Sequence, residues 1–234
     1  MKKVLFVAVI ALASVMAYAQ PRAIGARFGG FEGVSYQHSL GENNMIEIEL
    51  GYGMGGYVNG ATNVKYSALY DQMKNERWTW SFTGNVIEAA FTYDWINPFD
   101  KTIPWDKKGK WNWYLGVGAA GGYGWKDDIK ILNEKKERIY EYYLWWTGYD
   151  YVVKNWGYIG AAGRVGVEYE FWFPLVISAD FRPTLGVGLA ENPVYTDLVS
   201  EGMKEENVKK LMGKTQAGFY WDVFNVAISA RYKF

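Results

Sequence analysis

The chain has 234 residues, with 25 basic and 25 acidic side chains and a formal net charge of +0. No excess of positive charge is present to neutralise phosphates, so a nucleic-acid partner is not expected. The absence of cysteine excludes disulfides and thiolate metal sites. Aromatic residues make up 18% of the chain and include 12 tryptophans, a content typical of membrane barrels with aromatic girdles at both interfaces.

The first 19 residues have the pattern of a secretory signal. Two lysines precede an apolar run over residues 4–16, and Ala17 and Ala19 place small residues where a signal peptidase reads them. The run is shorter than the roughly 20 residues of a transmembrane helix. We therefore expect cleavage after Ala19, export, and one mature domain over residues 20–234. A buried N-terminal helix is the alternative.

Alternating apolar and polar segments follow the signal, and we interpret them as membrane-crossing strands. In the clearest one Ile46, Ile48 and Leu50 alternate with Glu47 and Glu49. The predicted strands cover about residues 22–30, 33–39, 45–53, 79–95, 110–125, 158–171, 175–183 and 218–234.

The fourth predicted strand has a change of parity. Its aromatic residues before Gly84 lie on the opposite phase from those after it. One extra residue flips every later side chain to the other face of a strand, so the change predicts a β-bulge near Gly84.

The last strand alternates strictly over eleven residues and ends on Tyr232 and Phe234. A terminal aromatic residue after such a strand resembles the C-terminal signal that the outer-membrane assembly machinery recognises during biogenesis. An amphipathic edge strand of a soluble protein is the alternative.

The links between strands alternate in length. Those after the third, fifth and seventh strands are long, and those after the second and sixth are short. Outer-membrane barrels have long extracellular loops and short periplasmic turns, so we expect both termini in the periplasm. Two links, the short first one and the long fourth one over residues 96–109, depart from this rule. An additional hairpin over residues 140–151 would give ten strands instead of eight.

Three segments carry a resemblance to a known family: "AIGARFGGFEGVSYQHSLGENNMIEIELGY", "GRVGVEYEFWFPLVISADFRP" and the terminal "ISARYKF". They resemble the small outer-membrane β-barrels of Bacteroidota, which are related in architecture to OmpX and to the OmpA membrane domain. The resemblance implies an all-β, eight-stranded, antiparallel up-and-down transmembrane barrel. It implies no activity, because members of the family are mostly without an assigned function.

Charges of both signs lie on the faces predicted to point inward. An eight-stranded barrel has an interior just wide enough for side chains to fill, and buried charges must be paired. We therefore predict an interlocked polar core that closes the lumen, with a narrow ion path as the alternative. The residues of this predicted network are Arg27, Glu47, Glu49, Glu88, Arg164, Glu168, Glu170, Asp180, Arg182, Arg231 and Lys233.

No catalytic site is predicted. The carboxylate pairs Glu47/Glu49 and Glu168/Glu170 point the same way along their strands, but into a filled lumen with no room for a sugar. The single histidine, His38, falls near the periplasmic end of its strand, away from lipid A, and is interpreted as an interface residue. We expect no metal and no cofactor.

The long links are where a binding function is expected. One contains a run of aromatic residues that could form a platform for a glycan or a protein partner; the alternative is strands continuing above the bilayer, with their rings in the outer girdle. The spacing over residues 196–213 fits either a short amphipathic helix across the barrel mouth or a flexible loop. The aromatic residues of the candidate platform are Tyr140, Tyr142, Tyr143, Trp145, Trp146, Tyr149 and Tyr151.

These patterns favour a non-enzymatic outer-membrane protein with a structural or binding role, in contact with outer-membrane lipid and lipopolysaccharide. The alternatives are an accessory subunit of a larger envelope complex in secretion, assembly or uptake, a small pore, and a lipid A-modifying enzyme.

Overall fold

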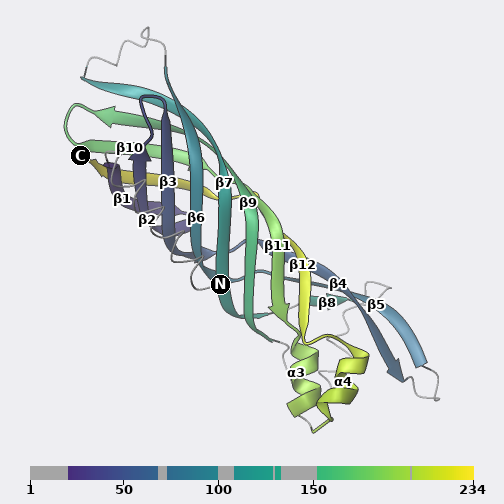
Figure 1. Cartoon of the computed structure of the whole chain (residues 1–234). Helices are drawn as coiled ribbons and strands as arrows, with labels where there is room; N and C mark the ends of the chain where they lie inside the picture. Colours follow the sequence, from purple (N-terminus) through teal and green to yellow (C-terminus); the bar gives the residue numbers. More distant parts are fainter. Residues whose placement is uncertain (1–20, 68–72, 100–107, 129, 133–151, 201) are drawn as a thin grey trace, which may run out of the picture.

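The structure is a computed structural model that describes residues 21–67, 73–99, 108–128, 130–132, 152–200 and 202–234. Most of these residues belong to antiparallel strands, and two short helices lie in one connection (Figure 1). The elements are β1 (Pro21–Gly29), β2 (Phe31–Ser39), β3 (Asn44–Met54), β4 (Tyr57–Ser67), β5 (Met73–Phe82), β6 (Asn85–Pro98), β7 (Gly109–Asp128), β8 (Lys130–Leu132), β9 (Val152–Phe171), β10 (Leu175–Phe181), β11 (Thr184–Glu191), α3 (Pro193–Ser200), α4 (Glu205–Leu211), β12 (Thr215–Asp222) and β13 (Val226–Lys233).

The sheet closes on itself. Strand β10 pairs with β13 on one side and with β9 on the other, and β13 pairs with β1. The ring therefore runs β1-β2-β3-β6-β7-β9-β10-β13 and returns to β1. This arrangement confirms the prediction of an all-β, eight-stranded antiparallel barrel.

The end of the barrel near α3 and α4, at the bottom of Figure 1, is called the upper end, and the end near the C-terminus is called the lower end. The wall changes above the short β1–β2 hairpin. Strands β4, β5, β11 and β12 continue the lines of β3, β6, β10 and β13 past the hairpin tip. There β12 pairs directly with β4, and β5 pairs with β8, which follows β7 in the chain. The upper wall thus consists of six strands side by side instead of eight. Strands β4 and β5 occupy most of the segment after β3 that was predicted to be a long loop.

A register shift lies opposite Gly84, at Gly55 and Gly56 of the neighbouring strand, where the Gly55 N–H donates to the Gly84 carbonyl at 2.7 Å. Pairing moves by one residue between Met54↔Asn85 and Val58↔Phe82, with the extra residue on the β3–β4 line. Trp80 and Val86, on either side of Gly84, are both buried in the barrel. The predicted bulge near Gly84 is therefore wrong, because the aromatic residue Trp80 points inward and not toward lipid.

The barrel has an inverted polarity. Its outward side chains are apolar and exposed, such as Ile159 at 71% and Val226 at 56% exposure. Its inward side chains include fully buried arginines such as Arg27 and Arg182. A soluble protein buries apolar side chains and exposes charged ones, so this surface suits a hydrocarbon surrounding.

Helices α3 and α4 lie at the end of the barrel opposite the C-terminus (Figure 1). Tyr195, Val208 and Met212 form a small apolar cluster between them. The sequence predicted one helix or a flexible loop over residues 196–213, and the structure has two helices. Within the described residues, no helix is long and apolar enough to span a bilayer.

Candidate functional site

The lower half of the lumen is filled by charged side chains from every part of the ring. They sit at alternate positions of β1, β3, β6, β9, β10 and β13, because residues two apart on a strand share a face. Nine of the predicted residues are buried in this network: Arg27, Glu47, Glu49, Glu88, Arg164, Glu168, Asp180, Arg182 and Arg231.

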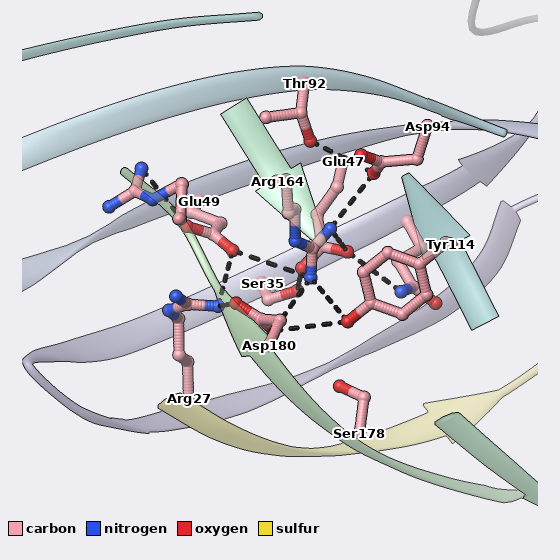
Figure 2. Close-up of polar contacts among 12 residues, drawn as sticks. Arg27, Ser35, Glu47, Glu49, Thr92, Asp94, Tyr114, Arg164, Ser178 and Asp180 are labelled. Atoms are coloured by element: carbon pink, nitrogen blue, oxygen red, sulfur yellow. Dashed lines mark hydrogen bonds and ion pairs between the residues drawn. The ribbon is translucent and has the colours of Figure 1, made fainter. Parts of the chain in front are cut away.

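Arg164 stands at the centre of the network (Figure 2). Its guanidinium donates to Glu47 and lies 3.0 Å from carboxylate oxygens of both Asp94 and Asp180. The guanidinium carbon also lies 4.6 Å from the centre of the Tyr114 ring. One cation is thus hydrogen-bonded to three carboxylates from three different strands, and a fourth carboxylate, Glu49, lies 3.9 Å away.

Two further arginines extend the network from Asp180 to Glu49 and Glu88. Arg27 Nη1 lies 2.8 Å from Glu49 and 2.7 Å from Asp180. Arg182 lies 3.3 Å from Glu49 and donates to Glu88. Each carboxylate is therefore held by at least one cation.

Arg231 extends the network toward the β13 side of the ring. It donates to Glu47 at 2.5 Å, to Ser35 at 2.7 Å and to Ser178 at 2.6 Å. These bonds connect β13 with β2, β3 and β10 across the lumen.

A second charged layer lies near the chain termini. Arg22 donates to Glu168 and, at 2.6 Å, to Glu170. Lys233 Nζ lies 2.8 Å from Glu170, but its side chain is 39% exposed, so it lies at the rim of the lumen. The predicted residues Glu168, Glu170 and Lys233 are thus brought together. Gln37 connects this layer to the Arg164 cluster, since it accepts from Arg22 at 3.0 Å and donates to Glu47 at 2.8 Å.

Sequence reasoning missed three members of the network. Asp94 and Tyr114 share the inward parity of Glu88 and Asn112, so alternation could have found them. Arg22 has the outward parity of its strand and could not have been found. A register shift between Pro21 and Ala23 turns it inward.

The upper half of the lumen is filled by apolar and aromatic side chains. Trp80, Trp156, Tyr158 and Tyr220 belong to one buried cluster. Tyr158 and Tyr220 stack with ring centres 3.6 Å apart and planes 8° apart. The Tyr158 hydroxyl donates to Glu88, which joins the aromatic layer to the charged layer below it.

Glycines on the strands make room for these rings. A Cβ atom at Gly124 would lie 2.2 Å from the Trp156 ring, and one at Gly60 would lie 2.2 Å from the Trp80 ring. On β7, Gly122 and Gly124 are therefore packing positions, at which the rings of Tyr158 and Trp156 lie against the backbone.

The other predicted residues lie outside the lumen. Tyr232 and Phe234 point outward, with ring centres 5.4 Å apart in an edge contact. His38 lies at the end of β2 opposite Pro21, and it is buried with Nδ1 3.0 Å from the Tyr36 hydroxyl. The candidate aromatic platform, Tyr140 to Tyr151, lies outside the described residues. Among the residues that the structure describes, no group of three or more His, Asp and Glu side chains could hold a metal ion.

A closed antiparallel barrel with an apolar outer surface and a charged interior defines the class: an outer-membrane-type transmembrane β-barrel. No protein-family model matches the chain, and no curated protein matches its sequence. Among solved structures, a major outer membrane protein from Thermus thermophilus is similar, with 10% identity and a TM-score of 0.39 over 93% of this chain and 100% of that chain. At that TM-score the class rests on the barrel's own construction, and the resemblance to Bacteroidota barrels stays a prediction.

Proposed function

We propose that this protein is a non-enzymatic integral protein of the outer membrane, with a sealed lumen and a structural or binding role at its extracellular end. The filling of the lumen supports the proposal. Among the described residues, the lower half holds an ion-pair network and the upper half holds a stacked aromatic layer, and we expect these two layers to block the barrel axis to solutes.

The charge balance of the lumen supports a seal over a selective pore. The network contains five arginines and one lysine against seven carboxylates, and each cation lies within 4.0 Å of a carboxylate. Near-neutral pairing leaves little field to select an ion. Breaking a buried pair costs about 3–5 kcal/mol, so spontaneous opening of the network is rare.

Single-channel recording in planar bilayers tests the seal. The refolded wild-type barrel is expected to give no unitary conductance. A variant with Glu88→Ala, Tyr158→Ala and Arg182→Ala removes the contacts that join the two layers and is expected to conduct. Discrete openings of the wild-type barrel would overturn the proposal in favour of a small pore.

Export and location are part of the proposal. Residues 1–19 have the signal pattern and lie outside the described residues. Membrane fractionation and N-terminal sequencing of the mature protein are expected to find it in the outer membrane, beginning at Gln20. A protein found in the soluble fraction would contradict this.

A role as an accessory subunit is the second candidate. The observation that favours it is the six-stranded upper wall with α3 and α4 at its end, which extends the barrel beyond the β1–β2 hairpin. Extraction in mild detergent followed by pull-down distinguishes the two candidates, because a subunit brings a stoichiometric partner and a lone barrel does not.

A further inference from the structure

A cavity of about 580 Å³ lies in the side of the barrel, at the tip of the β1–β2 hairpin. Below it the wall is continuous, since Gly29 pairs with Ala227 and Phe31 pairs with Gly53. Above it the wall closes again where Tyr57 pairs with Trp221. The cavity is therefore a lateral notch, bounded by the hairpin tip, by residues 52–57 and by residues 221–225.

The notch lies at the upper boundary of the membrane-embedded band. Strand β1, which ends beneath it, has nine residues. At ~3.3 Å per residue and a tilt of ~40° it rises about 23 Å, close to the roughly 25 Å height of the apolar band of such barrels. With the termini in the periplasm, as the link lengths predict, the notch faces the headgroup region of the outer leaflet.

Electron-rich rings surround the notch. Tyr57 and Trp221 stack above it with ring centres 4.7 Å apart and planes 23° apart. Tyr52 lines its side and pairs across the strands with Glu32. Faces of tyrosine and tryptophan attract cations within about 6 Å.

Two carboxylates complete the lining. Asp222 is held in place, since its Oδ1 accepts from the Phe224 backbone N–H at 3.2 Å and its Oδ2 accepts from Asn225 Nδ2 at 3.3 Å. Glu32 lies on the exposed outer face of the hairpin tip.

Among the described residues that line the notch, none is a lysine, an arginine or a histidine. Arg27 approaches Asn225 from the lumen, and it is already paired with Glu49 and Asp180. The lining is thus complementary to a positive charge and repels a negative one.

We propose that this notch binds the ammonium headgroup of an amphiphile in the outer leaflet. The ammonium lies between the carboxylates of Glu32 and Asp222 and the rings of Tyr57 and Trp221. The alkyl chain of the amphiphile runs down the outer surface of the barrel along Phe224 and Val226, which are 76% and 56% exposed.

Equilibrium dialysis against three probes with the same chain tests the charge preference. Decylammonium, decanol and decanoate are each dialysed against the full barrel in neutral maltoside micelles, with protein-free micelles as the blank. We expect one saturable site per barrel for decylammonium, binding about tenfold weaker for decanol, and no saturable binding for decanoate. Ethylammonium, which lacks the chain, is expected not to compete at equal concentration.

Two variants test the residues. The double variant Glu32→Gln and Asp222→Asn is expected to weaken decylammonium binding about tenfold while the unfolding midpoint is retained. The control Glu206→Gln, which removes one exposed negative charge from α4, is expected to leave binding unchanged. Equal binding of all three probes, or an unchanged affinity in the double variant, would overturn the proposal.

Conductance and fractionation do not enter this experiment. A pore or a different location would therefore be detected separately from a failure of the notch to bind.

Discussion

Arg164 is the residue on which the charge network depends most, and replacing it with methionine tests that dependence. Methionine is unbranched and uncharged, and it is shorter than arginine by two atoms along the side chain. The change removes the cation shared by Glu47, Asp94 and Asp180. The three carboxylates differ in the partners that they keep after this change, and the difference gives a quantitative expectation.

Two of the three carboxylates keep other partners. Glu47 retains Arg231 at 2.5 Å, and Asp180 retains Arg27 at 2.7 Å. Asp94 retains only the Thr92 hydroxyl, at 3.0 Å, among the contacts of the described residues. Leaving a buried charge without its partner costs about 3–5 kcal/mol, so we expect Arg164→Met to lower the free energy of unfolding by about that amount.

Adding Asp94→Asn to Arg164→Met is expected to recover about 1–3 kcal/mol, because a neutral amide has a smaller desolvation cost than an unpaired carboxylate. Urea unfolding and refolding titrations of the barrel in lipid vesicles, monitored by tryptophan fluorescence, measure the free energy of unfolding. Lys233→Met is the matched control: its ion pair with Glu170 is 39% exposed on the lysine side, so a loss of about 1 kcal/mol or less is expected. A loss below about 1 kcal/mol for Arg164→Met, or no recovery in the double variant, would refute the reasoning.

Three further predictions concern other parts of the molecule. Gly124→Ala places a Cβ atom 2.2 Å from Trp156 and is expected to cost about 1–3 kcal/mol in the same titration, whereas Gly163→Ala, with its nearest atom at 3.6 Å, is expected to be neutral. Lys209 and the Tyr195 hydroxyl hold the pKa of Glu205 below its usual value by hydrogen bonding. The resulting stabilisation of the α3–α4 pair is present above the ordinary glutamate pKa and is lost as the pH falls through the lowered pKa. Cleavage between the helices by an acid-stable protease is therefore expected to accelerate in acid, and an unchanged cleavage rate would contradict the assignment. Deletion of Phe234 is expected to reduce the amount of folded barrel in the outer membrane severalfold, while Trp172→Ala, an exposed aromatic of the β9–β10 turn, leaves it unchanged.

Strict alternation predicted most of the lower barrel. Glu47 and Glu49 on β3, and Arg231 on β13, were placed in the lumen by their parity alone, because lipid outside and filled space inside impose opposite polarities on the two faces. The same rule predicted the closed ring and its eight strands.

The upper barrel could not be predicted in this way. Its interior is aromatic, so Trp80 looks like a lipid-facing residue in the sequence, and the bulge was assigned to the wrong strand. The bulge itself lies at Gly55 and Gly56, and because glycine has no side chain, the sequence shows no alternation at these two positions. Strands β4 and β5 are polar enough to resemble a loop, since they continue above the apolar band.

The contacts of the notch could not be predicted either. Glu32 and Asp222 are far apart in the chain and look like ordinary turn residues. They line the same cavity because the β1–β2 hairpin is shorter than the strands beside it, and hairpin length relative to its neighbours appears only in the assembled sheet.

The seam between β1 and β13 joins the first and last strands of the chain. Closure therefore requires β13: a chain that lacks this strand leaves β1 and β10 as open edges, each with unpaired backbone groups in a medium without water. The ring also encloses the charge network, and Arg231 reaches it only from β13. Barrel closure and the pairing of Arg231 with Glu47 are thus one event: until β13 is in place, Glu47 has only Arg164 as its cation.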